Sequence, residues 1–573
     1  SSAASDVYKR QMFKRLLPVR YLRKHSVAVV VIVLLILALL RALQGFNMCD
    51  DGFNLSGYRL VFSSPGSINY LFLFYWLINV GGLWNMLFGE FGIYGFRVLE
   101  CIILAANTFF VWRLVHPFIK PAAINIGFMM AFSMLQWIEV FDYNAFSSFS
   151  AYLSILIIVP ALLRNNRFLT YLSGFVLGLS FFVRLPNVSY CLLSVVFIFH
   201  YCYLPCGNKS LTFKLLFTAV LGCLSGVFVT FCYMYFMGHL FYFLEAVDDM
   251  FFLAGNTENT HGSGTMFRVL IYNNAHICLR FVLMSLCPLF TVVAFRIFGK
   301  SRWLRFICFV LLVLHLLLLI IFNTVPLYVT NAMAISACLY VAYVKQHEPA
   351  IVYTSILAML TVLVLPLGSD GGVITFGAYS LWLALPFVPY AVSLWLDRFE
   401  GALRKQLMIL MLATFGLYAA RNIYNIYGPA YYEKSNRMED VYAVEYPRVN
   451  VYMDKKTAVE LDTLLDVLKT KVEPGDTTMF MGDTPMLYYI TDTRPWLRNP
   501  WAWIFGYDYC VRQLDIVRKA GEKLPVVVCE RVDLEGKDKR SALLQSFLTA
   551  NEYVSYYAGT RFLIFLPPHY DFS

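Results

Sequence analysis

The sequence of 573 residues is 59% hydrophobic and only 14% charged, whereas ordinary soluble domains carry about 25% charged residues. This composition excludes a soluble globular enzyme and predicts a polytopic membrane protein. The formal net charge of +10 does not require a nucleic-acid partner if the basic residues sort to one side of the membrane.

The chain begins with SSAASDVYKRQ, which fits neither a signal peptide nor a helix. We expect residues 1–11 to be a non-native leader, with Met12 as a plausible natural start. A basic stretch follows Met12. Residues 26–46 then form an apolar run that lacks a small-residue cleavage site and is longer than a signal-peptide core. This run predicts a first membrane helix that is retained.

Apolar segments of spanning length recur through residues 12–425 and predict a transmembrane domain of about thirteen helices. They cover residues 27–46, 94–116, 121–138, 149–163, 168–184, 187–205, 212–236, 268–295, 304–322, 326–344, 349–366, 376–396 and 403–425. The segment 69–88 differs, because Trp76, Asn79, Trp84 and Asn85 interrupt its apolar residues. We expect it to lie in the membrane interface rather than to cross.

The distribution of Lys and Arg supports this topology. If residues 69–88 do not cross, the loops on the side of the basic N-terminus contain Lys120, Arg164, Arg167, Lys209, Lys214, Arg296, Lys300, Arg302, Arg305, Lys345, Arg398, Arg404 and Lys405. The opposite loops then hold almost no basic residues, in agreement with the positive-inside rule. We therefore predict an integral membrane protein, of a bacterial inner membrane, with a cytoplasmic N-terminus and a periplasmic C-terminal part.

Residues 426–573 differ in composition and predict a small soluble α/β domain of ordinary domain size. The stretch 456–472 reads as a helix and 473–476 as a turn. The stretches 477–483 and 524–533 read as strands, and 553–567 reads as a hairpin that turns at Gly559 and Thr560.

The thirteen cysteines are scattered mostly within apolar segments. Cys202 and Cys206 form the closest pair, but no second pair or His partner stands at metal-ligand spacing. We predict neither a disulfide framework nor a zinc site. A bridge between Cys510 and Cys529 stays open, and no cofactor is predicted, although a divalent cation beside acidic residues stays possible.

An acidic pair, Asp50 and Asp51, stands where the first predicted helix leaves the membrane, and Gly52 follows it. Adjacent like charges repel, so we expect at least one of the two carboxylates to have a raised pKa or to bind a cation or a donor. That is the electrostatic profile of a general base. Gly52 lets a substrate or a backbone approach closely. The alternative is that the pair is simply a solvated loop.

Other outer loops are also acidic. Glu139 and Asp142 stand with Tyr143 and Asn144 in QWIEVFDYNAFSSF, before the next span. For the acids of the loop at 245–249, the interpretation as ordinary solvated charges is the better one. Asp370 lies in a Gly-rich turn, LPLGSDGGVITFG, where structural and substrate-binding roles both stay open.

The first outer loop also carries a resemblance. The stretch DDGFNLSGYRLVFSSPGSINY, with Pro65, and the later FRVLE resemble the corresponding loop of GT-C glycosyltransferases, in particular the family 39-like group of protein O-mannosyltransferases and aminoarabinose transferases. The stretches FDYNAFSSFSAYLSIL and LSGFVLGLSFFVRLPNV continue the resemblance through the first two hundred residues. Those families have an Asp-Asp or Asp-Glu pair after the first span, and Asp-Asp stands here.

The resemblance implies an enzyme that transfers a hexosyl or pentosyl group, with inversion, from a polyprenyl-phosphate-linked donor to a hydroxyl of a lipid, glycan or protein; the metal-independent members of the family use Arg or Lys to hold the leaving phosphate. By position, Asp50 and Asp51 match the family's acidic pair, one as base and one as its orienting partner. Glu139 or Asp142 matches the second acidic position. Tyr143 is expected to contact substrate.

Further substrate contacts are expected from the polar and basic residues of the same face. Arg184 is the best candidate to bind the lipid phosphate, with Arg59 and Arg268 after it, and Asn144 and Asp370 complete the predicted site. An Arg at the end of a span is also often a snorkelling anchor, so both roles of Arg184 stay open.

The main alternative function is that of a transporter or a flippase for lipid-linked sugars. Such proteins usually have internal repeats and ionisable residues near mid-membrane, and no repeat is visible here. A polymerase or ligase of oligosaccharides would concentrate its function in one large late outer loop, and the loop after residue 238 is short for that role.

Overall fold

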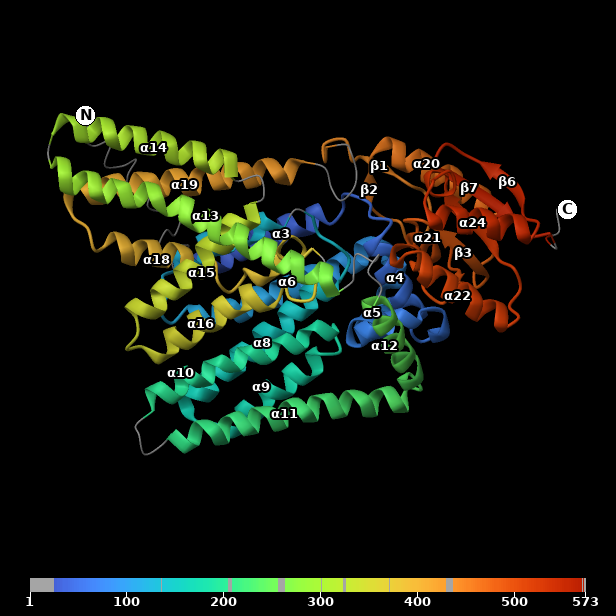
Figure 1. Cartoon of the computed structure of the whole chain (residues 1–573), viewed down its shortest axis with the longest axis horizontal. Helices are drawn as coiled ribbons and strands as arrows, with labels where there is room; N and C mark the ends of the chain where they lie inside the picture. The colour runs from blue at the N-terminus through green and yellow to red at the C-terminus, as the bar shows by residue number, and fades with distance from the viewer. Residues whose placement is uncertain are drawn as a thin grey trace, which may run out of the picture.

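We describe a computed structural model that covers residues 25–135, 137–204, 209–255, 263–299, 301–322, 326–369, 371–428, 436–568 and 570. The predicted leader of residues 1–11 and the predicted site residue Asp370 lie outside the described residues. The molecule is elongated, with a helical bundle at one end and an α/β domain at the other (Figure 1).

Each predicted apolar segment coincides with helical structure in the bundle. The bundle helices are α3 (Ser26–Arg41), α6 (Gly92–Val115), α7 (Pro121–Met134), α8 (Tyr143–Arg164), α9 (Arg167–Ser180), α10 (Val196–Tyr203), α11 (Lys209–Phe236), α13 (Ser263–Phe298), α14 (Arg302–Phe322), α15 (Pro326–Val344), α16 (Pro349–Val364), α17 (Val373–Ser380), α18 (Phe387–Leu396) and α19 (Gly401–Tyr427), with a 3₁₀ segment, η4 (Leu185–Val195), before α10. In α7 and α16 the first residue is proline, which is suited to that position because its missing N–H has no helical partner there.

By length and composition, seven helical stretches among the described residues could cross a membrane: Asn69–Val115, Tyr143–Arg164, Leu185–Tyr203, Lys209–Phe236, Gly264–Phe298, Arg302–Ile321 and Pro326–Val344. Shorter apolar helices are Ser26–Arg41, Pro121–Met134, Pro349–Val364 and Phe387–Leu396. The chain is thus a helical membrane protein, and the predicted count of thirteen spans is larger than the number that meets this criterion.

Helices α9 and α11 pack closely because glycines line their contact. A Cβ atom on Gly178 would lie 2.1 Å from the carbonyl oxygen of Cys223, and one on Gly222 would lie 2.0 Å from that of Tyr171. The two backbones therefore touch, in the manner of small-residue packing between membrane helices.

The segment 69–88 forms a 3₁₀ segment, η2 (Asn69–Phe74), and α5 (Tyr75–Phe88). Helix α5 has 14 residues, fewer than the roughly 20 that a span requires. It packs against α4 (Asp50–Leu60) at the end of the bundle that faces the α/β domain (Figure 1). The interfacial position of residues 69–88 stays a prediction, because these residues also belong to the apolar stretch Asn69–Val115.

The C-terminal part contains a five-stranded sheet in the order β4-β3-β5-β7-β6. The strands are β3 (Thr477–Met481), β4 (Arg494–Pro495), β5 (Val526–Glu530), β6 (Val554–Ala558) and β7 (Phe562–Leu566), and a separate antiparallel pair joins β1 (Tyr442–Ala443) to β2 (Tyr452–Met453). Strand β3 runs parallel to β4 and β5, whereas β7 is antiparallel to β5 and β6. The helices are α20 (Lys455–Leu468), α21 (Met486–Ile490), α22 (Tyr507–Lys519), α23 (Arg531–Leu534) and α24 (Lys539–Ala550). The predicted helix, two strands and hairpin are all present.

The α/β domain shares its hydrophobic core with helices α4 and α5. A Cβ atom on Gly52 of α4 would lie 2.1 Å from the backbone nitrogen of Met486, and that nitrogen donates a hydrogen bond of 3.0 Å to the carbonyl of Met48. Phe53 of α4 packs against Trp501. The absence of a side chain at Gly52 therefore allows the close approach of a backbone, one of the two roles predicted for it. That backbone belongs to the C-terminal domain.

Candidate functional site

The acidic pair begins helix α4, and its two members have different surroundings. Asp51 is 1% exposed and forms an ion pair of 3.1 Å with Arg97 of α6. Its other oxygen accepts a hydrogen bond of 3.3 Å from the backbone N–H of Val140. Arg97 also donates to the carbonyls of Ala42 and Gln44, at 3.1 and 3.2 Å. Asp51 and Arg97 therefore join α4, α6 and the chain before α8.

Burial is the main cause that raises the pKa of Asp51, and Arg97 offsets part of the effect. The pKa of Asp51 is thus raised, as predicted for one member of the pair, but the cause is burial rather than repulsion by Asp50. Asp50 is half-buried and lies near Cys49. Burial raises the pKa of the Cys49 thiol, and Asp483 and Asp50 raise it further.

Glu139 and Asp142 lie together in the segment between α7 and α8. Asp142 is the N-cap of α8 and accepts a hydrogen bond of 2.8 Å from the backbone N–H of Ala145, the usual role of Asp at this position. The side chain of Asn144 also donates to Asp142. Trp137 donates to Glu139 at 2.8 Å, and the carboxyl groups of Glu139 and Asp142 share a hydrogen bond.

The shared hydrogen bond makes this a proton-sharing pair of carboxyl groups. Burial, with the charge of Glu100, raises the pKa of Asp142 to about 7. Burial and the neighbouring Asp142 raise the pKa of Glu139 well above its ordinary value. Because two close carboxylates repel, the pair binds one proton more readily than either group would alone. A carboxylate with a pKa near neutrality is suited to general base catalysis.

A further buried acid, Glu100, was not identified from the sequence. It lies on α6, one turn after Arg97, and is fully buried. Tyr379 of α17 donates to it a hydrogen bond of 2.8 Å. The signal in the sequence was an acid inside an apolar segment of spanning length, which commonly marks a functional position.

Tyr143 and Arg184 connect the acidic residues to α17. The Tyr143 ring stacks on Phe74 at 5.1 Å, and the guanidinium of Arg184 lies 6.0 Å above Tyr143 and 4.1 Å above Phe376. Arg184 is 4% exposed and donates to the main-chain carbonyls at residues 365 and 367, at 3.1 and 2.8 Å. Arg184 therefore fastens the turn that leads to α17 beside the acidic residues.

A cavity of about 190 Å³ lies on the other side of this turn. Its lining is mainly apolar and comes from α13, from the end of α16 and from the turn to α17: Met266, Phe267, Leu270, Asn273, Asn274, Ile277, Val362, Leu363, Pro366, Leu367, Gly368, Ser369, Gly372 and Val373. Leu367, whose carbonyl accepts from Arg184, is one of these residues. Arg184 thus contacts both a residue of the cavity lining and Tyr143, which directly follows Asp142 in the chain.

Two predicted substrate-binding residues are not in this group. Arg59 forms an ion pair with Asp492 of the α/β domain and donates to the carbonyl of Thr493, while burial lowers its pKa. Arg448 reaches the same Asp492 at 3.3 Å. Arg59 therefore attaches α4 to the C-terminal domain. Arg268 is exposed on α13.

The acids at 245–249 lie on helix α12 (Leu240–Ala254) and contact the C-terminal domain. Glu245 pairs with Arg498 at 2.8 Å. Asp248 and Asp249 pair with Arg512 at 2.6 and 3.2 Å. They are contacts with the C-terminal domain rather than the solvated charges that were expected, and Asp249 is buried. Among the described residues, no three His, Cys, Asp or Glu side chains are grouped so that they could hold a metal ion, and Cys510 and Cys529 are both free.

Comparison with protein-family models gave no match, and comparison with curated proteins gave no significant match. The geometry of the site therefore carries the functional argument.

Proposed function

We propose that this protein is a membrane glycosyltransferase that moves a sugar from a polyprenyl-phosphate-linked donor to a hydroxyl group of a lipid, glycan or protein. We also propose that its helices make about thirteen crossings in a GT-C-like arrangement, with the N-terminus in the cytoplasm and the α/β domain in the periplasm of a bacterial cell.

The observation that carries this proposal is the proton-sharing pair of Glu139 and Asp142 at the domain end of the bundle. Its hydrogen bonds fix the Asp142 carboxylate on the N-terminus of α8, and its pKa of about 7 matches the requirement for a general base near neutral pH. Asp51 is charge-paired with Arg97, so we assign Asp51 a positioning role. Asp50 stays a candidate for contact with the acceptor.

The proposed reaction is a single displacement at the anomeric carbon of the donor sugar. The acceptor oxygen attacks the anomeric carbon while its proton passes to the Asp142 carboxylate, and the bond from that carbon to the phosphate oxygen breaks. The lipid phosphate leaves with the bonding electrons, and attack from the opposite face inverts the anomeric carbon. Proton transfer of this kind contributes about 10²- to 10⁴-fold to a rate.

The arrangement around Arg184 supports a lipid-linked donor. The cavity of about 190 Å³ has an apolar lining that suits a hydrocarbon chain, and Arg184 places a positive charge between it and Tyr143. A fixed cation near a leaving phosphate stabilises the charge that develops there. The substrate of this class would thus extend from the cavity, past Arg184, to the acidic pair.

The test is transfer of radiolabelled sugar from a pool of polyprenyl-linked donors to membrane lipids and proteins. We expect wild type to transfer label and Asp142→Asn to lose transfer by about 10²-fold or more. Asp50→Asn and Asp51→Asn test the sequence-based assignment, and Asp466→Asn, at a side chain that is 70% exposed, is the matched control. Unchanged transfer by a well-folded Asp142→Asn variant would exclude the proposed base.

One observation favours the alternative of a transporter or flippase. Arg280 and His276 of α13 lie against Tyr328 of α15, with the guanidinium 5.4 Å above the Tyr328 ring and a hydrogen bond of 2.5 Å between Arg280 and His276. Ionisable groups inside membrane helices commonly mark a transport path. Loss of lipid movement in Arg280→Gln, together with no sugar transfer by wild type, would favour this second function.

A further inference from the structure

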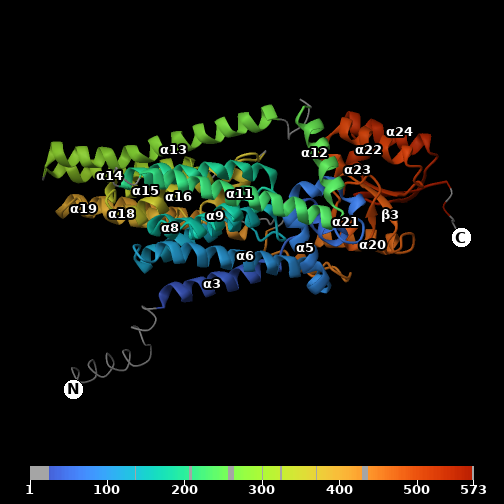
Figure 2. The same cartoon turned by 90° about the horizontal axis from the view of Figure 1, so that it is seen from below.

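Helix α12 lies across the direction of the bundle helices. It follows α11, and both Figures 1 and 2 show it running across the direction of α11. Gly238, with φ +70°, makes the corner between the two helices, a conformation that glycine adopts readily. Because α11 is long and apolar enough to span a membrane, a helix that crosses its direction at its end is oriented along the membrane surface.

One side of α12 is bound to the rest of the protein. Asp249 accepts hydrogen bonds from Tyr509 and Gln513, at 3.2 and 3.3 Å, and Phe243 is buried next to Phe182. These contacts join α12 to α22 and to the end of α9.

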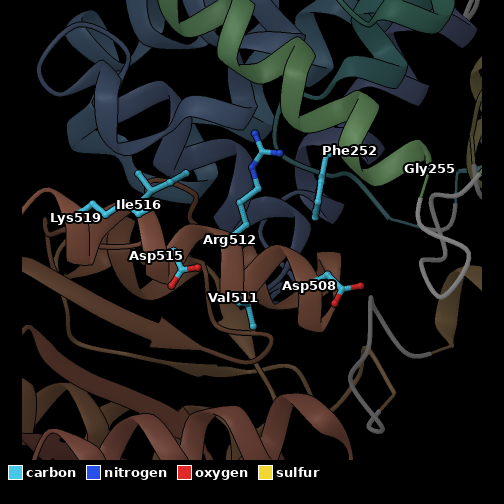
Figure 3. Close-up of a pocket in the computed structure, with 8 residues that line it drawn as sticks. All are labelled: Phe252, Gly255, Asp508, Val511, Arg512, Asp515, Ile516 and Lys519. Carbon is cyan, nitrogen blue, oxygen red and sulfur yellow. The ribbon is translucent and has the colours of Figure 1, made fainter.

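A second side of α12 borders an open groove against α22. This groove, of about 700 Å³, is lined by Phe252, Gly255, Asp508, Val511, Arg512, Asp515, Ile516 and Lys519. Figure 3 shows Arg512 reaching from α22 toward α12, beside Phe252. The four charged side chains of α22 spaced along this groove suit an aqueous surface.

The third side of α12 is exposed and carries three large apolar side chains, with Asp248 among them held by its ion pair with Arg512. Phe241, Leu244 and Phe251 are 63%, 55% and 67% exposed, and their spacing of three and seven residues places them on one helical face. This face continues the exposed apolar surface at the end of α11, where Tyr235 and Phe236 are 69% and 83% exposed. Since the exposed apolar surface of a spanning helix faces lipid, the same lipid phase extends to α12.

We propose that α12 is an interfacial helix whose Phe241, Leu244 and Phe251 insert into the leaflet next to the α/β domain. Its partner is the lipid surface itself. Because Glu245, Asp248 and Asp249 of the same helix pair with Arg498 and Arg512, the inserted helix attaches the α/β domain to the bilayer at a fixed height. A helix that exposes large apolar side chains beside charged ones is suited to the boundary between lipid and water. The proposal is independent of the chemistry assigned to the site.

The test uses the full chain in phosphatidylcholine liposomes. We would replace Phe241 or Phe251 by the photoreactive p-benzoylphenylalanine, irradiate, and detect lipid adducts by mass spectrometry. Phe228, 68% exposed on α11, is the control for contact with lipid, and Val532, 74% exposed on α23, is the control for an aqueous surface. All four replacements are at exposed side chains and leave the core intact.

We expect lipid adducts at positions 241 and 251, as at 228, and none at 532. Two results would overturn the proposal. One is the absence of lipid adducts at 241 and 251 when 228 gives them. The other is cross-linking of 241 and 251 to a second copy of the chain, which would identify this face as a protein interface. Gel filtration of each variant before reconstitution excludes misfolding as the cause.

Discussion

The proton-sharing pair predicts a specific dependence of stability on pH, which Asp142→Asn should remove. Burial raises the pKa of Asp142 from its ordinary value of 3.8 to about 7. Its side chain is 3% exposed, so solvent screens the effect little. With about 1.4 kcal/mol for each unit of pKa, the ionised form is less stable in the folded protein by on the order of 4 kcal/mol.

The sign follows from proton binding. The folded state holds a proton on Asp142 that the unfolded state releases above about pH 4. This stabilisation is therefore complete below pH 3.8 and is lost as the pH rises to about 7. We expect the free energy of unfolding of wild type to fall between pH 4 and 7, with Glu139 adding to the fall because its pKa is also raised.

Asn at position 142 keeps the helix cap, because Asn and Asp are nearly equal at the N-cap, but it cannot bind the proton. The Asp142→Asn variant should therefore show a smaller fall in stability between pH 4 and 7, measured by unfolding in detergent across that range. Asp142→Ala should show the same smaller fall and lose about 0.5–2 kcal/mol more at every pH, because the cap is gone. A fall as steep in Asp142→Asn as in wild type would refute the assignment.

Three further predictions concern packing. Arg97→Met should lower the free energy of unfolding by about 3–5 kcal/mol, because it leaves Asp51 buried without its cation, and Asp51→Leu added to it should restore part of the loss in thermal unfolding. Gly178→Ala should destabilise by about 1–3 kcal/mol, since its Cβ would lie 2.1 Å from a carbonyl of α11, whereas Gly416→Ala, with nothing within 4 Å, should not destabilise in the same assay. Gly52→Ala should loosen the α/β domain, because its Cβ would lie 2.1 Å from the main chain of α21, and limited proteolysis should then release that domain faster than from Gly416→Ala.

The secondary structure could be predicted because it depends on local patterns. Apolar runs gave the bundle helices, and an all-buried VVVCE gave the central strand β5. Burial on both faces explains why that strand is continuously apolar. The number of crossings could not be fixed in the same way, because several helices, such as α9 with 14 residues, are shorter than a full span.

The site was predicted only in part, because its contacts join distant residues. Asp51 pairs with a residue 46 positions away, and Glu100 receives a hydrogen bond from a residue 279 positions away. Arg59 forms its ion pair with Asp492, which is 433 positions away. A single sequence shows that a charge exists, but it does not show which partner neutralises the charge.

Helical geometry explains why the adjacent pair is not the proton-sharing pair. Successive residues of a helix point about 100° apart, so neighbours in sequence do not face each other. Asp51 turns inward to Arg97, while Asp50 is only half-buried. Glu139 and Asp142 precede α8, where the chain is not helical and can bring two carboxyl groups together. Close carboxylates at a helix N-cap are therefore better candidates for a general base than an acidic dipeptide inside a first turn.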